Sequence, residues 1–100
     1  MRARRTDSNL TEIVKAYRKL GCRVDVTNMR WDLTVQFGGL TDLVEVKDGA
    51  KPPSARKLTE AEEKTHETLM IRMVMSIEQV ADHVAALHEK SLAIHWRGAK

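Results

Sequence analysis

A pair of glycines, Gly38-Gly39, separates two segments of alternating apolar and polar residues, and it restricts most strongly how this chain can fold. Two glycines in this position favour a tight hairpin with a two-residue loop. In that hairpin Phe37 pairs with Leu40, and counting outward along both strands places Asp32 opposite Glu45. Directly opposed residues share one face of a sheet, with Cβ atoms about 5 Å apart. The hairpin therefore predicts two neighbouring carboxylates.

The same face is expected to carry a lysine, because Lys47 follows Glu45 by two positions on one strand. Two opposed carboxylates repel each other, and a divalent cation between them removes that repulsion. The pattern thus favours a chemical role over the ordinary alternative, which is a solvated sheet face with Lys47 paired to Glu45. A shift of the register by one residue would remove the pairing.

Periodicity predicts one α/β domain that spans residues 1–100 and contains mostly regular elements. The expected elements, in chain order, are a helix over 9–20, strands over 23–29, 32–37 and 42–47, a loop over 48–57, a helix after Thr59, a strand over 70–75 and a helix over 77–90. Residues 1–8 form a basic arm and residues 91–100 a tail. In the tail, the alternation of Leu92, Ile94 and Trp96 predicts a short added strand.

Each expected helix begins with the spacing of a capping box, in which a polar residue is followed three positions later by Glu or Gln. The pairs are Asn9 with Glu12, Thr59 with Glu62, and Ser76 with Gln79.

Composition narrows the classes of function. The 100 residues suit one small domain, and the 42% hydrophobic and 31% charged content suits a folded chain. No apolar run is long enough to span a bilayer, and residues 1–5 lack the apolar segment of a signal peptide. Cys22 is the only cysteine, which excludes an internal disulfide and fits a reducing cytoplasm. The net charge of +3 is compatible with binding to nucleic acid.

One segment carries a more specific pattern. From Val44 the chain runs Val-Glu-Val-Lys-Asp-Gly, continues through a basic loop with Pro52-Pro53, and reaches Leu58-Thr59 at a helix start. Together with the aspartate at the second strand and the order of elements, this segment resembles the PD-(D/E)XK nuclease superfamily. It is most similar to small stand-alone VRR-NUC proteins of phages and bacteria. The resemblance implies a restriction-endonuclease-like αβββαβ core, a mixed central sheet flanked by helices, followed by a third helix and a tail.

The resemblance also implies site residues. Asp32, Glu45 and the backbone carbonyl of Val46 would be metal ligands, and Lys47 the catalytic lysine. The expected cofactor is Mg²⁺ or Mn²⁺, which prefer oxygen ligands of these kinds. This chain has Trp31 where the family usually has a proline.

Two glutamates are additional catalytic candidates that the resemblance adds. They are Glu12, on the first helix, and Glu62, which stands where relatives often have a glutamine. Capping of a helix is the alternative role for both residues.

Basic residues next to the motif are candidates for DNA contacts. Lys51, Arg56 and Lys57 would bind phosphates, unless they only make the loop soluble, and His66 is a further candidate unless it is an incidental surface histidine. The expected function is a metal-dependent DNA endonuclease selective for branched DNA such as a Holliday junction. We expect a homodimer in the bacterial cytoplasm, either a bacterial protein or a phage protein in its host. The alternatives are a non-catalytic DNA-binding module and a nuclease subunit that needs a partner.

Overall fold

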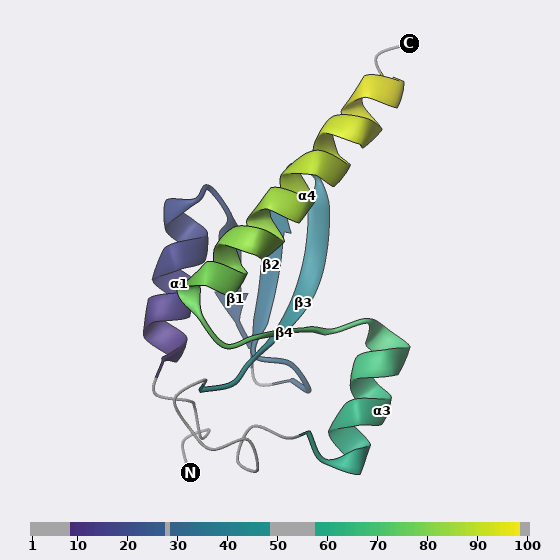
Figure 1. The fold of residues 1–100 in the computed structure, drawn as a ribbon. Coiled ribbons are helices and arrows are strands. Elements are labelled where there is room, and N and C mark those ends of the chain that lie inside the picture. Colours follow the sequence, from purple (N-terminus) through teal and green to yellow (C-terminus); the bar gives the residue numbers. More distant parts are fainter. Residues whose placement is uncertain (1–8, 28, 49–57, 99–100) are drawn as a thin grey trace.

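The computed structural model describes residues 9–27, 29–48 and 58–98 (Figure 1). Its elements, in chain order, are α1 (Leu10–Lys19), β1 (Arg23–Val26), β2 (Leu33–Phe37), β3 (Leu40–Val46), α3 (Glu60–Leu69), β4 (Arg72–Val74) and α4 (Ile77–Gly98). The strands form one sheet in the order β1-β2-β3-β4, in which β3 and β4 are parallel and the other pairs antiparallel. The prediction of an α/β fold with a mixed sheet is confirmed.

The hairpin between β2 and β3 has the predicted register. Phe37 pairs with Leu40 and Leu33 with Val44. Gly38 and Gly39 have φ angles of 56° and 84°, in the region that glycine adopts without steric cost. The loop is also pinned from outside, because the Ser91 hydroxyl of α4 donates a 2.8 Å hydrogen bond to the Gly38 carbonyl.

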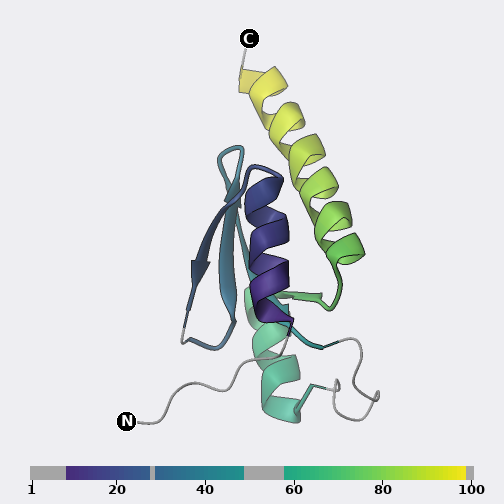
Figure 2. The ribbon, with the colours of Figure 1, turned by 90° about the vertical axis from the view of Figure 1, so that its left-hand side faces the viewer.

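The core lies between the sheet and two helices. Seen edge-on in Figure 2, α1 and α4 cover the same face of the sheet. Alternate residues of β2, including Leu33 and Val35, are fully buried on that face, and Val44 and Val46 of β3 join them. The short helix α3 lies at the end of the sheet away from the hairpin loop (Figures 1 and 2).

A buried polar chain crosses this core. The imidazole of His83 in α4 is hydrogen-bonded at Nδ1 to the Tyr17 hydroxyl and at Nε2 to the Asp42 carboxylate, both at 2.7 Å. Burial lowers the pKa of His83 and, more strongly, raises the pKa of Tyr17. The chain therefore joins α1, β3 and α4, and its Tyr17 and His83 side chains favour their neutral forms.

The tail does not form the predicted strand. Residues 91–98 continue α4, so the expectation of a strand at Leu92–Trp96 is wrong. The reason is that Ser91 extends the buried stripe of Val80, Val84 and Leu87 by one more helical turn. Beyond Ser91 the apolar side chains of Leu92 and Ile94 are both exposed, so they do not form the buried face of a strand.

Three strands are shorter than predicted, β2 by Asp32 alone and β1 and β4 by three residues each. Met70 is not part of β4, because it ends α3 with a left-handed φ of 55°. The first strand ends at Val26, which is exposed although it was expected to share the buried face of Val24. β1 stops there because Thr27 begins a turn, with its hydroxyl donating to the Trp31 carbonyl at 2.6 Å.

The capping predictions have mixed outcomes. Thr59 and Glu62 form the full capping box at α3. Ser76 accepts a bond from the Gln79 amide, while the Gln79 side chain accepts from Met75 rather than from the cap residue. Asn9 makes no side-chain cap, so that prediction is wrong.

None of the helices in the part of the chain that the structure describes has the length and apolarity that crossing a bilayer requires.

The two loop glycines offer a test of how α4 supports the hairpin. Alanine at either glycine strains a positive φ, at a cost of about 1–2 kcal/mol. A Cβ at Gly38 would in addition lie 2.7 Å from the Ser91 Cβ, whereas at Gly39 the nearest side-chain atom, His95 Nε2, is 4.0 Å away. We expect Gly38→Ala to lose more free energy of unfolding than Gly39→Ala, measured by urea denaturation. Equal losses would mean that α4 does not constrain the loop.

Candidate active site

Two buried carboxylates lie at the end of the β2–β3 hairpin. Asp32 directly precedes β2, and its side chain is as buried as that of Glu45 in β3, with residue exposures of 7% and 8%. The Asp32 amide donates to the Val44 carbonyl, and its carboxylate accepts a 2.8 Å bond from the Val46 amide. Asp32 is thus bonded to the two residues that flank Glu45 in β3. The two carboxylates are neighbours, as the hairpin register predicts.

The proximity of the two acids changes their chemistry. Burial, reinforced by the negative charge of Asp32, raises the pKa of Glu45 to about 7, although Lys47 opposes the shift. A carboxyl group with this pKa exchanges a proton near neutral pH, which is uncommon for glutamate.

Lys47 points toward this pair, as the sequence predicts. Its ammonium lies 3.8 Å from Glu45 Oε2 and 3.6 Å from Glu62 Oε2, and the side chain is 16% exposed. Glu62 therefore has two roles, because its other oxygen accepts the Thr59 amide at 3.0 Å in the capping box. The cap holds the Glu62 carboxylate in a fixed position beside the lysine.

His66 lies one turn after Glu62 on α3. Its Nε2 atom is buried and has no hydrogen-bond partner among the described residues. Burial lowers the pKa of His66, and the charges of Glu62, Lys47 and Asp32 all act on it. The ring thus belongs to the same group of side chains, here called the acidic cluster: Asp32, Glu45, Lys47, Glu62 and His66.

The cluster opens into a cavity of about 390 Å³ between α3 and the turn that precedes β2. Glu45 and Glu62 line it, together with Met29, Arg30, Ala61 and Thr65. A substrate in this cavity would touch both acids.

Several predicted residues lie elsewhere. The Glu12 side chain is exposed on α1, and no hydrogen bond or ion pair connects it to another described residue. Lys51, Arg56 and Lys57 fall outside the described residues. The Val46 amide is used by Asp32, so this residue is at the cluster as expected, and its carbonyl remains a predicted ligand.

Asn9 has a role that the capping pattern concealed. Its side-chain nitrogen donates to the carbonyls of Lys47 and Met75, each at 3.1 Å. These carbonyls follow the ends of β3 and β4, so one amide ties α1 to both strands next to the cluster. Asn, Asp, Ser and Thr commonly bond to backbone groups, but no local signal identifies a partner 38 residues away.

His83 and Arg30 are the other residues that sequence reasoning missed. His83 occupies the i+3 position after Val80 on the apolar stripe of α4, which marks a buried histidine but not its partners. Arg30 reaches α3 through a 3.5 Å contact from Nη1 to the Thr65 hydroxyl, across the sequence gap of 35 residues.

The oxygen ligands of the acidic cluster suit a small divalent cation. Within the described residues, no three His, Cys, Asp or Glu side chains converge as a preformed metal-binding group. Mg²⁺ does not require such a group, because it keeps several waters and is usually bound through one or two carboxylates. Two buried carboxylates, one with a raised pKa, fit an ion of this kind.

Comparisons with known proteins place no relative beside this chain: no family model, no curated protein and no solved structure matches it.

The raised pKa of Glu45 predicts a specific pH dependence of stability. Between pH 4.5 and about 7 the folded protein keeps a proton on Glu45 that the unfolded chain releases, so this residue makes stability fall as pH rises through that window. We expect Glu45→Gln to be more stable than the wild type above pH 7, in the absence of metal, and the difference to shrink toward pH 4.5. Urea unfolding across this range measures it.

Glu63→Gln, which replaces an exposed glutamate on α3, is the matched control and should show no such trend. A constant difference between Glu45→Gln and the wild type at every pH would contradict the assignment.

Proposed function

We propose that this protein is a metal-dependent DNA endonuclease whose active site is the acidic cluster. The observation that carries the proposal is the buried Asp32–Glu45 pair with the Lys47 ammonium 3.8 Å from Glu45. Burying two neighbouring carboxylates costs free energy unless a partner, such as a bound cation, compensates their negative charge. A hairpin selected only for stability has no reason to keep them.

Asp32 and Glu45 would hold a Mg²⁺ or Mn²⁺ ion, with the Val46 carbonyl as a third protein ligand. When bound, such an ion polarises the phosphate and lowers the pKa of a coordinated water. The Val46 amide fixes the direction of the Asp32 carboxylate through its 2.8 Å bond, so this ligand is oriented before the ion arrives.

Lys47 supplies the positive charge of the site. Its ammonium would orient the attacking water and offset the negative charge that accumulates on the phosphate in the transition state. Glu62 contacts the ammonium at 3.6 Å, which limits its rotation. Hydrolysis joins the water oxygen to phosphorus and breaks the bond to the departing sugar oxygen.

The finer proposal concerns fold and substrate. The order of elements, with Asp32 before β2 and Glu45 and Lys47 at the end of β3, supports a restriction-endonuclease-like core of the PD-(D/E)XK type. The small size leaves little surface for reading a long sequence, which favours recognition of DNA shape, such as a four-way junction.

Cleavage of labelled four-way-junction, duplex and single-stranded DNA with Mg²⁺ or Mn²⁺ tests the proposal. Lys47→Ala and Asp32→Asn should each lower the rate by about 10²-fold or more, as loss of a charge-stabilising group does. Lys15→Ala, at an exposed lysine of α1, is the control and should cut like the wild type. Calorimetric titration with Mn²⁺ should show binding that Asp32→Asn loses.

Metal-dependent cutting that persists in Lys47→Ala and Asp32→Asn would assign the activity to other residues. Binding to DNA with no cutting of any substrate would favour the non-catalytic module or a subunit that needs a partner.

A homodimer would present two such sites to a junction with two-fold symmetry. Helix α4 projects beyond the sheet (Figure 1). After Ser91, which contacts the hairpin loop, it carries the exposed side chains of Leu92 and Ile94, and we propose this segment as the interface. Light scattering at micromolar concentration should give twice the monomer mass, and replacing both residues with serine should halve it. A monomeric wild type would count against the dimer.

A further inference from the structure

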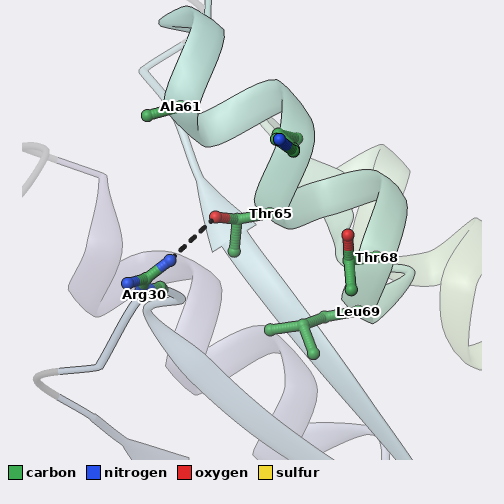
Figure 3. Close-up of a pocket in the computed structure, with 6 residues that line it drawn as sticks. Arg30, Ala61, Thr65, Thr68 and Leu69 are labelled. Carbon is green, nitrogen blue, oxygen red and sulfur yellow. Dashed lines mark hydrogen bonds between the residues drawn. The ribbon is translucent and has the colours of Figure 1, made fainter.

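A second cavity, of about 480 Å³, lies next to the acidic cluster (Figure 3). It shares Arg30, Ala61 and Thr65 with the cavity that Glu45 and Glu62 line, so the two cavities adjoin each other along α3. Their linings differ, because only the first cavity is lined by the acids Glu45 and Glu62. The second is lined by Arg30, Ala61, Lys64, Thr65, Thr68 and Leu69.

The helix that forms one wall has an unusual relation to the rest of the protein. None of the residues of α3 is buried, although most helices in proteins depend on a packed face for stability. Its ends compensate, because Thr59 and Glu62 cap the first turn and the Ile71 amide bonds to the His66 carbonyl at the last. Most helices have one side packed against a core, whereas the corresponding side of α3 lines the second cavity.

The side chains of α3 are sorted by chemistry around its axis. At about 100° per residue, Ala61, Thr65 and Thr68 fall on one side, with Lys64 and Leu69 at its margins. Three exposed glutamates fall well away from that side, at Glu60, Glu63 and Glu67. The helix thus keeps its negative charges out of the second cavity.

The opposite wall is supplied by the turn between β1 and β2. Thr27 shapes this turn through its bonds to the Trp31 carbonyl and the Met29 amide, and the Asp32 carbonyl accepts the Thr27 amide at 2.9 Å. Arg30 projects from the turn to the Thr65 hydroxyl, as Figure 3 shows. Because Asp32 closes the same turn, the position of Arg30 is tied to that of the carboxylate pair.

We propose that this second cavity binds one nucleotide of the DNA strand adjacent to the phosphate at the acidic cluster. Arg30 and Lys64 hold its backbone phosphate, with hydroxyl donors from Thr65 and Thr68, since arginine, lysine and threonine are common phosphate-binding residues. The sugar lies against the apolar lining of Ala61 and Leu69. This assignment rests on the proposed nuclease function and names where its substrate is gripped. It also explains how a polyanion approaches a site with buried acids, because Arg30 lines both cavities and Lys64 adds a second cation in the adjoining one.

The first test measures binding of labelled single-stranded and four-way-junction DNA by fluorescence anisotropy, without divalent cation and over a range of KCl concentrations. Arg30→Gln and Lys64→Gln should each raise Kd roughly tenfold, the loss expected for one charged hydrogen bond. Each should also reduce the slope of log Kd against log salt by about one.

Lys90→Gln is the matched control, because it removes the same charge at an exposed position next to Ser91, near the hairpin loop and away from α3. It should leave the salt slope unchanged. Ala61→Leu is a second variant that fills the cavity without altering charge and suits a helix. It should raise KM in the cleavage assay while the salt slope stays near the wild-type value.

The outcomes separate this inference from the proposed function. Wild-type cutting together with Arg30→Gln and Lys64→Gln that match Lys90→Gln in Kd and salt slope would overturn the nucleotide site and leave the nuclease standing. Binding that depends on Arg30 and Lys64, with no cutting by the wild type, would support the site and overturn the proposal of a nuclease that acts without a partner. A wild type that neither binds nor cuts DNA would overturn both.

Discussion

The register of the β2–β3 hairpin decides where Asp32, Glu45 and Lys47 of the acidic cluster lie. Side chains alternate between faces, so a shift of one residue would turn Glu45 into the helix-covered core and Val44 toward the cavity. Two constraints hold the register. One is the conformation of Gly38 and Gly39, and the other is the hydrogen bond from Ser91 to the loop. At the far end of the hairpin, Asp32 completes the alignment by bonding to both neighbours of Glu45 in β3.

Much of the sheet could be predicted because its determinants are local. A glycine pair and period-two alternation specify a hairpin without reference to the rest of the chain, and Phe37–Leu40 pairing followed from them. The alternation at Leu92–Trp96 misled for the opposite reason. Alternation with a period of two indicates a strand only where a partner strand can pair with it. Residues 92–96 instead continue the helix whose buried stripe begins at Val80.

The candidate site was predictable in part for the same reason. Asp32, Glu45 and Lys47 come from one hairpin, so counting residues brings them together. The contributions of α3 depend on tertiary structure: Arg30 and Thr65, or Lys47 and Glu62, meet only because the helix is placed at the end of the sheet. Asn9 shows the limit of local patterns most clearly. Its spacing to Glu12 favoured a cap, but its side-chain nitrogen instead donates to the two carbonyls that follow β3 and β4.

The polar chain from Tyr17 through His83 to Asp42 has a consequence for how the protein reaches its native state. Its two bonds join residues 66 and 41 positions apart, so neither can form while the chain is only locally organised. Until α4 docks, the Tyr17 hydroxyl and the Asp42 carboxylate lack their partner His83. The entropy cost of closing these long loops must be met before either bond can form. Contacts of this kind raise the contact order and slow folding. The same chain makes docking selective, because a helix that slides by one residue leaves the buried Tyr17 hydroxyl and His83 ring without partners.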